Sequence, residues 1–315
     1  MNLIVLPAST HKRSRVVSEL RDSLIRSGKT IAQAIADKDL YFRVSLVGGC
    51  NLSCAFCHNE GAPLQGRMEI SFAIEAIAAA AQVGFTRVQF TGGEPLLHPQ
   101  VSTFVRYAKE IVADVGVTTN GTFLQKNIES LLAAGLTRVH ISLQVESLLD
   151  AGRNGAWGIP RWLSPMLDHA AAGRVTLRLN MPVPADALEQ AKDFLKSISH
   201  YGCDLKVFSI LPEGESQGCS YPLEQLGIIV DQENIRRSTA NLEGRVFLRS
   251  YRPPVGFRCK TCGDFARCKE QSHSLRLGAD RILRPCLATR AWDAQLRETD
   301  MMQQISEAAL LALDF

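Results

Sequence analysis

Between residues 41 and 211, short runs of apolar and β-branched residues alternate with longer segments of helical pattern. The longer segments include an expected helix at 71–83, with Ser71 as its N-cap and Gly84 at its end, and another at 185–199. The short runs are six expected strands, at 42–47, 87–91, 115–119, 138–143, 176–180 and 205–211. This alternation predicts βαβ units around a parallel sheet. Six strands are too few for a closed eight-stranded barrel, so we expect an α/β fold, a partial (β/α)6 barrel with its chemistry at the C-terminal strand ends.

The segments on either side of this core have a different character. The N-terminal segment contains one expected helix, at about 16–35, and no chemical motif. After residue 211 the alternation stops, and a cysteine-rich stretch precedes a last expected helix at about 293–311. The sequence therefore predicts three regions: an N-terminal helical extension at 1–40, the barrel at 41–211, and a cysteine-rich region with a C-terminal helix at 212–315.

Composition and charge exclude several classes of protein. With 46% hydrophobic and 21% charged residues, the chain resembles an ordinary soluble enzyme. No apolar run is long enough to span a bilayer. The basic residues near the N-terminus follow a short apolar run, which is the reverse of a signal peptide. We therefore expect a cytoplasmic protein without membrane partners, and a net charge of +3 is too small to indicate nucleic acid.

The nine cysteines are many for a cytoplasmic chain, where disulfides are rare. Three lie at 50–57 and four at 259–286, which leaves Cys203 and Cys219 as expected buried side chains. Clustered thiols in a reducing compartment indicate bound metal.

The first group, Cys50, Cys54 and Cys57, has the spacing C-x3-C-x2-C directly after the first expected strand. Thiolates are soft ligands suited to iron–sulfur clusters, and the amides of a compact loop stabilise a cluster's negative charge. Three ligands for four irons leave one iron open. The alternatives are accidental spacing and a structural zinc site, which would need His58 as its fourth ligand.

This triad, with the aromatic Phe56 before its last cysteine, resembles the signature of the radical SAM superfamily. There the open iron is chelated by the amino and carboxylate groups of S-adenosylmethionine (SAM). The turn after the second expected strand resembles the family's GGEP motif, which contacts the SAM amino group. The resemblance implies a [4Fe–4S] cluster, and SAM contacts from Phe56, Gly92, Gly93, Glu94, Pro95 and Ser142. For Ser142, a strand-end hydroxyl satisfied by the backbone is the alternative interpretation.

Within the superfamily, the sequence resembles the subgroup of the molybdenum-cofactor GTP cyclase more closely, through residues 118–121, 139–143, 178–180 and 208–212. That resemblance implies substrate contacts from Arg43, Thr118, Arg178 and Arg276. Guanidinium groups bind phosphate or carboxylate through paired hydrogen bonds. A salt bridge at a strand end, or charge compensation for a cluster, is the alternative for each arginine.

The second cysteine group, Cys259, Cys262, Cys268 and Cys286, can hold zinc or a second cluster. Because residues 275–287 resemble the tail of the cyclase's auxiliary-cluster motif, and also twitch and SPASM extensions, we expect an auxiliary [4Fe–4S] cluster. The cyclase uses three cysteines there and has one where this chain has Ser272. With Cys268 added, the cluster is expected to have four cysteine ligands and to be closed to substrate.

Other departures concern the substrate. Gln89 and Ser274 stand where the cyclase has further arginines, and the cyclase's terminal Gly-Gly is missing at 310–315. We therefore expect an anionic small molecule, such as another nucleotide or a nucleoside, rather than cyclisation of GTP.

The sequence thus predicts a radical SAM enzyme that splits SAM into methionine and a 5′-deoxyadenosyl radical, with an electron donor such as flavodoxin or ferredoxin. It assigns no catalytic side chain. One alternative is a peptide-modifying SPASM or twitch enzyme, for which the N-terminal extension is short. The other is a non-catalytic metal-binding protein, which would have no need of the SAM-binding turn at 92–95.

Overall fold

The computed structural model describes residues 10–54, 57, 65–152, 157–183, 187–198, 201, 203–209, 246–248, 274–286 and 289–313. The chain divides into two units. The first combines Met1–Gly116 with Arg252–Phe315, and the second is Val117–Tyr251. The division falls within β3 (Asp114–Thr119).

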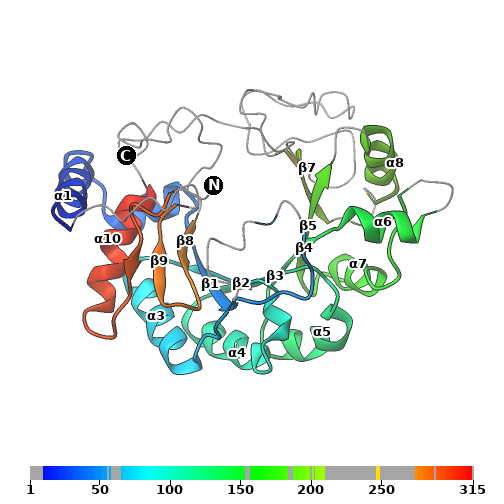
Figure 1. Ribbon diagram of the computed structural model, residues 1–315, viewed down its shortest axis with the longest axis horizontal. Coiled ribbons are helices and arrows are strands. Elements are labelled where there is room, and N and C mark those ends of the chain that lie inside the picture. Colours follow the sequence, from blue (N-terminus) through cyan, green and yellow to red (C-terminus); the bar gives the residue numbers. More distant parts are fainter. Residues whose placement is uncertain are drawn as a thin grey trace. The chain divides into compact units, whose positions relative to one another are not determined.

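The first unit is built around β1 (Tyr41–Val47). On one side β1 pairs in parallel with β2 (Arg87–Gly92), and on the other with β8 (Ser274–Leu277). β9 (Ile282–Arg284) runs antiparallel to β8, and β10 (Ala294–Gln295) runs antiparallel to β9. The strand order is therefore β10-β9-β8-β1-β2 (Figure 1). The hairpin of β8 and β9 was not expected from the sequence.

Alternation along β1 gives the sheet of the first unit two different faces. Phe42, Val44 and Leu46 are fully buried on one face, while Arg43 and Ser45 lie on the other. Three helices pack on the apolar side: α3 (Ile70–Val83) contacts β1, α4 (Val101–Ile111) lies beside α3, and α10 (Met301–Leu313) contacts β8 and β9 (Figure 1). The opposite face therefore carries the polar side chains of the strands.

The two ends of α3 differ in how well the sequence predicts them. Its N-cap is Glu69, without a side-chain cap hydrogen bond, so the prediction of Ser71 as the cap is wrong. The structure places Ser71 inside the first turn. At the other end Gly84 adopts φ +119°, and its amide donates to the carbonyls of Ala80 and Ala81, as predicted for a C-terminal glycine. A Cβ at Gly84 would lie 2.5 Å from the Cβ of Ala32, so this end also needs glycine for space.

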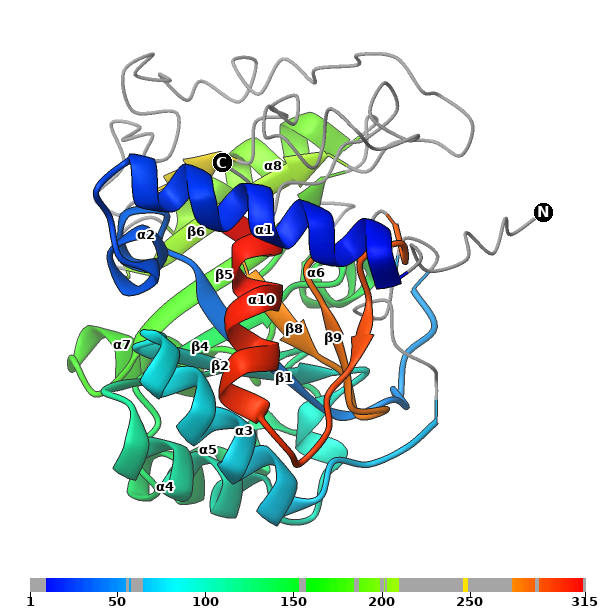
Figure 2. The same cartoon turned by 90° about the vertical axis from the view of Figure 1, so that its left-hand side faces the viewer.

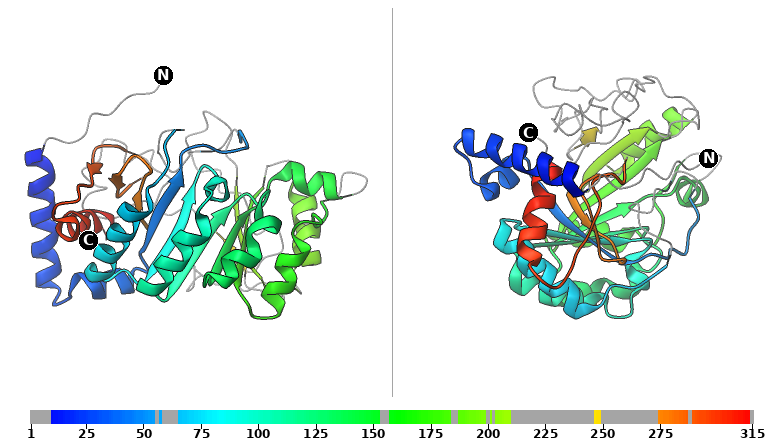
Figure 3. Two further views of the ribbon diagram at one scale, coloured as in Figure 1. Left: turned by 90° about the horizontal axis from the view of Figure 1, so that it is seen from below. Right: turned by 60° about the vertical axis from the view of Figure 1, so that its left-hand side comes forward.

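The N-terminal extension forms two helices where one was expected. α1 (Thr10–Arg26) ends before Gly28, which has φ +69°. α2 (Ile31–Asp37) then begins with a capping box in which Thr30 and Gln33 exchange hydrogen bonds. Both helices contact α10, and α1 crosses one end of it (Figures 2 and 3). The beginning and the end of the described chain are thus packed together in the first unit.

The second unit contains four parallel strands in chain order: β4 (Arg138–Ser142), β5 (Thr176–Val183), β6 (Asp204–Ser209) and β7 (Val246–Leu248). Its helices, in green in Figure 3, are α5 (Leu124–Ala133), α6 (Val145–Ala151), α7 (Ser164–Ala171) and α8 (Leu188–Ile198). β7 was not expected, because no strand pattern marks it in the sequence. In the described part of the chain, no helix is long and apolar enough to cross a membrane.

Candidate functional site

The C-terminal ends of β1 and β2 are joined by backbone hydrogen bonds. The amide of Gly93 donates to the carbonyl of Val47 (2.9 Å), and the amide of Glu94 donates to that of Gly49 (3.0 Å). The approach is so close that a Cβ on Gly93 would lie 2.2 Å from the Gly49 oxygen. Gly92 has φ +146°, and a Cβ there would lie 2.3 Å from the Val47 oxygen. Glycine is therefore required at both positions, and the start of the cysteine loop lies against this turn.

The turn is closed by a buried carboxylate. Glu94 is fully buried, and its Oε1 accepts a hydrogen bond from the amide of Leu96 (3.0 Å). This bond caps η2 (Pro95–Leu97), a short 3-10 helix whose first residue is Pro95. Proline suits this position because a first helical residue has no amide bond to lose. The four residues Gly92 to Pro95 therefore form one rigid turn beside the cysteine loop.

The cysteine loop carries three thiols without disulfides. Cys50 and Cys57 are exposed, and Cys54 is half-buried. The amide of Cys57 donates to the carbonyl of Cys54 (3.0 Å), and the amide of Leu52 donates to the Sγ of Cys50 (3.4 Å). Among the described residues, no three His, Cys, Asp or Glu side chains already converge as a metal-binding group. The donor set nonetheless fits an iron–sulfur cluster, because ligand loops can close around a metal as it binds.

A row of polar residues lies across β8, β1 and β2 on the polar face of the first unit. Arg43 of β1 is in register with Arg276 of β8 on one side and with Gln89 of β2 on the other. Arg43 donates to the hydroxyls of Tyr41 and Thr91, each at 3.2 Å. The structure therefore places two predicted substrate arginines on neighbouring strands, and Arg43 reaches the residue before Gly92.

Two neutral side chains share this face. Gln89 is fully buried within the row. Ser274 lies in register with Tyr41 and is also fully buried, and among the described residues its hydroxyl has no hydrogen-bond partner. The carbonyl of Ser274 accepts from Arg276 (3.3 Å). A buried polar atom that lacks a protein partner leaves a hydrogen bond for a ligand to make.

The remaining predicted residues of the barrel lie in the second unit. Thr118 is at the end of β3 and Ser142 is the last residue of β4. Arg178 of β5 is in register with Asp204 of β6, and its Nη2 lies 3.4 Å from the Asp204 Oδ2. The alternative of a strand-end salt bridge is thus realised for Arg178. Phe56, His58, Cys259, Cys262, Cys268 and Ser272 lie outside the described residues.

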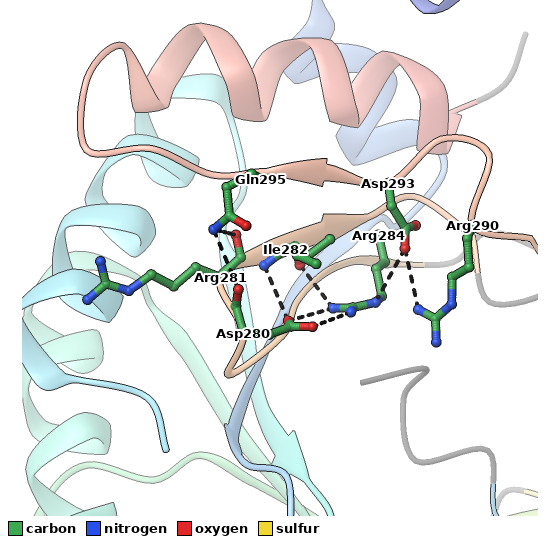
Figure 4. Close-up of polar contacts among 7 residues, drawn as sticks. All are labelled: Asp280, Arg281, Ile282, Arg284, Arg290, Asp293 and Gln295. Atoms are coloured by element: carbon green, nitrogen blue, oxygen red, sulfur yellow. Dashed lines mark hydrogen bonds and ion pairs between the residues drawn. The ribbon is translucent and has the colours of Figure 1, made fainter. Parts of the chain in front are cut away.

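Sequence reasoning missed an ion-pair cluster next to Cys286. Cys286 is a reduced, buried thiol just after β9. Beside it, Arg284, only 4% exposed, binds Asp280 of the β8–β9 turn (2.5 Å) and approaches Asp293 (3.6 Å) (Figure 4). Arg290 also pairs with Asp293, at 3.4 Å. These four residues, Asp280, Arg284, Arg290 and Asp293, are called the Arg284 cluster below. The one indication of this cluster in the sequence is the four-residue spacing between Asp280 and Arg284.

Asp293 is the member of the Arg284 cluster whose pKa is raised by burial. Burial raises its pKa from 3.8 to about 6, although Arg284 and Arg290 lower the pKa and Asp280 raises it. Arg13 of α1 also faces this carboxylate, and burial lowers the pKa of Arg13. A raised folded-state pKa means that the folded protein binds this proton more tightly than the unfolded chain does.

Replacing Asp293 with asparagine is therefore expected to change how stability depends on pH. Between about pH 4 and pH 6 the wild type should lose about 3 kcal/mol that the variant keeps. Arg284 still has Asp280, and Arg290 is 42% exposed, so neither is left buried without a carboxylate. Denaturant unfolding of the apoprotein should give nearly equal stabilities at about pH 4, and a more stable variant above about pH 7. An equal difference at both pH values would contradict the expectation.

Comparison with known proteins supports the interpretation of the strand-end site. The model of the Radical SAM superfamily matches residues 44–150. The GTP 3′,8-cyclase of Chlorobaculum tepidum is 40% identical over 106 residues, which cover 33% of this chain and 32% of the cyclase. The GTP 3′,8-cyclase of Cyanothece is 31% identical over 286 residues, which cover 82% of this chain and 84% of the cyclase.

A solved structure supports the fold. Streptococcus suis SuiB bound to S-adenosylmethionine superposes with a TM-score of 0.60 at 15% identity. The match covers 85% of this chain and 65% of the SuiB chain. The predicted fold class, an α/β fold with the parallel strands of a partial barrel, is confirmed.

The long match to the Cyanothece cyclase extends the kinship well beyond the cysteine loop. The prediction of an enzyme is confirmed, and its cofactors include a [4Fe–4S] cluster and SAM, while the non-catalytic alternative is set aside. The chain belongs to the radical SAM superfamily and, within it, to the family of the GTP 3′,8-cyclases.

Proposed function

We propose that this enzyme reductively cleaves SAM at a [4Fe–4S] cluster held by Cys50, Cys54 and Cys57, and acts on an anionic small molecule bound by Arg43 and Arg276. The observation that carries the proposal is the backbone junction at the strand ends, where the amides of residues 93 and 94 bond to the start of the cysteine loop. Arg43 lies on β1, one of the two strands that end at this junction, and Arg276 lies in register with it on the neighbouring strand β8.

Each part of the site has a separate task. The three thiolates hold the cluster and leave one iron for the amino and carboxylate groups of SAM. The turn from Gly92 to Pro95 presents backbone groups to SAM, and it can pack against the start of the cysteine loop because Gly92 and Gly93 carry no Cβ. When bound, the cluster supplies the electron that splits SAM into methionine and a 5′-deoxyadenosyl radical, which takes a hydrogen atom from the substrate. Phe56 and Ser142 complete the proposed SAM contacts, and a flavodoxin or ferredoxin is the proposed electron donor.

The substrate class follows from the polar row. Two guanidinium groups on adjacent strands favour a phosphate or carboxylate. Gln89 and the buried hydroxyl of Ser274, which has no partner in the described part of the chain, add neutral hydrogen-bonding groups to the same face. Relatives named for GTP support a nucleotide, or a nucleoside that carries an acidic group, and the neutral residues favour a compound with fewer negative charges than GTP. Thr118 and Arg178 are proposed as further contacts, Arg178 together with its partner Asp204.

The test is anaerobic turnover. Reconstituted enzyme with dithionite and SAM should release 5′-deoxyadenosine, and a panel of purine and pyrimidine nucleosides, monophosphates and triphosphates should identify the substrate as the compound that accelerates release. Arg276→Gln should raise the KM for that compound by about tenfold or more, because one charge-assisted contact is lost. Arg281→Gln is the matched control, since Arg281 lies on the same hairpin but pairs with the exposed Glu69 and Glu298. A neutral nucleoside that outcompetes every anion would contradict the role of the arginines.

A second [4Fe–4S] cluster is proposed at Cys259, Cys262, Cys268 and Cys286. Of these ligands only Cys286 lies among the described residues, where it is reduced and buried. The protein in which Cys50, Cys54 and Cys57 are all alanine should still bind about four irons per chain, with Mössbauer spectra of a cluster with four cysteine ligands. Zinc without iron in this variant would make the site structural.

Replacing Cys268 with alanine decides whether that cluster is closed. Loss of a fourth ligand should expose one iron and destabilise the second cluster without removing the first. In the wild type, the spectrum of the second cluster should change little when substrate is added, because none of its four irons is open. Unchanged iron content and spectra in Cys268→Ala would mean three ligands, and substrate coordination by the second cluster would become the better proposal.

A further inference from the structure

The chain around Cys286 is held by side chains on both sides. It leaves β9 at Arg284, places Cys286 two residues later, and returns to β10 at Ala294. Asp293 lies immediately before β10. Its Oδ2 forms ion pairs with Nε of Arg284 (3.6 Å) and Nη1 of Arg290 (3.4 Å), and its amide donates to the Arg290 carbonyl (3.1 Å). Figure 4 shows these groups directed toward one another. The two ends of the Cys286 segment are therefore bridged by one guanidinium.

The other side of the same guanidinium is fixed by the β8–β9 turn. Arg284 donates through Nη1 to Oδ1 of Asp280 (2.8 Å) and through Nη2 to Oδ2 (2.5 Å), a paired contact (Figure 4). Gly278 leaves the space for it, because a Cβ there would lie 2.2 Å from the Asp280 Oδ1 and 2.3 Å from the Arg284 Nη1. Arg284 also lies opposite Arg276 across the strand pair, so the carboxylates offset a like-charge contact.

We propose that the Arg284 cluster positions Cys286 for the second iron–sulfur cluster, by fixing the segment that carries its thiol before iron is bound. Arg284 is the central positioning residue, with Asp280 and Asp293 as its two anchors. The inference rests on the proposed second cluster, and it concerns side chains to which the proposed chemistry assigns no role.

The composition of the Arg284 cluster favours positioning over simple stabilisation. The Oδ1 of Asp293 is buried without a hydrogen-bond donor in the described part of the chain. Burial raises the pKa of Asp293 to about 6, so keeping this carboxylate ionised beside Arg284 at neutral pH costs the folded protein stability relative to the unfolded chain. A charge retained where it opposes folding is typical of a group kept for its geometry.

The test compares Asp293→Asn with the matched control Arg281→Gln in the otherwise intact chain. Alkylation of the apoprotein by iodoacetamide, resolved by peptide mass spectrometry, reports how firmly Cys286 is held. Asp293→Asn should accelerate alkylation of Cys286 by about tenfold or more, since one anchor of its segment is lost. Cys203 is the internal reference, because it is buried and burial raises its pKa to about 11. After reconstitution, iron at the second site should fall by about tenfold, while the first site keeps its iron.

Hydrogen exchange at the amides of Gly93 and Glu94 shows whether the first unit remains folded in each variant. If protection there is retained and Cys286 reacts at the wild-type rate, the Arg284 cluster has no positioning role. Acceleration of Cys203 together with Cys286, or an equal effect of Arg281→Gln, marks general loosening and also overturns the proposal. Absence of iron at the second site in the wild type would overturn the proposal of a second cluster. The alkylation rates of Cys286 are measured without iron, so they distinguish this outcome from a failure of the positioning role.

Discussion

Replacing Cys50, Cys54 and Cys57 together with alanine is expected to lower 5′-deoxyadenosine release to the level measured without protein. The loss should exceed about a hundredfold, since removing even a supporting contact around a metal commonly costs 10–100-fold. The three thiols lie in one loop whose start is fixed against the Gly92–Pro95 turn. Without them, the loop sequence has no thiolate left to hold a cluster close to bound SAM. The measurement is chromatographic quantification of 5′-deoxyadenosine after anaerobic reconstitution, with dithionite and SAM in excess.

The control for this variant is Cys203→Ala. Cys203 is buried in the second unit, and burial raises the pKa of its thiol to about 11, so it is a poor metal ligand. Its loss should leave both the iron content and the product yield unchanged. Cleavage of SAM that persists in the triple variant would refute the assignment of the triad.

Gly93→Ala is expected to have the second-largest effect. Its Cβ would lie 2.2 Å from the oxygen and 2.4 Å from the carbon of the Gly49 carbonyl, which are backbone atoms and cannot rotate away. The strand ends must separate, which breaks the bonds from Gly93 to Val47 and from Glu94 to Gly49. SAM affinity, measured by equilibrium dialysis, should fall by more than about tenfold, and stability by roughly 1–3 kcal/mol as for other overpacked sites.

Gly173→Ala separates these two effects. Gly173 has φ +68° in the second unit, and a Cβ there would meet no atom within 4 Å. Alanine at this position should lower stability by about 1 kcal/mol through backbone strain alone. SAM affinity should stay at the wild-type value. Wild-type SAM affinity in Gly93→Ala would show that the close approach of the two strand ends does not shape the SAM site.

The strands of the barrel were predictable because each is a local apolar run next to a turn. β1, β2 and β4 lie within one residue of their expected bounds. β8, β9 and β10 were missed, because strands of four residues or fewer owe their conformation to pairing with β1 and with each other. The sequence predicts one helix in the N-terminal region, because the break between α1 and α2 depends on Gly28 and the capping box at Thr30 rather than on apolar periodicity.

The site divides in the same way. The cysteine triad and the Gly-Gly-Glu-Pro turn are each contiguous in the sequence, so the spacing of their residues along the chain is enough to predict them. The neighbourhood of Arg43 and Arg276 depends on strand register between distant segments, and the contact of Arg284 with Asp293 depends on how a hairpin folds back. No local pattern encodes either of these. The roles of individual residues and the three-region division of the chain stay predictions.

The pairing of β1 with β8 has a consequence for biosynthesis. One edge of β1 finds its partner only when residues 274–277 have left the ribosome, and α10, which packs on α3, follows later still. Until then the nascent chain exposes an unpaired strand edge and an apolar helix face, both of which invite aggregation. The cysteine loop is already synthesised by this stage, and its support is incomplete. Iron delivery to this loop should therefore follow the synthesis of residues 274–277, and cells that overproduce the protein should benefit more from slower translation and chaperones than from a greater supply of iron before that point.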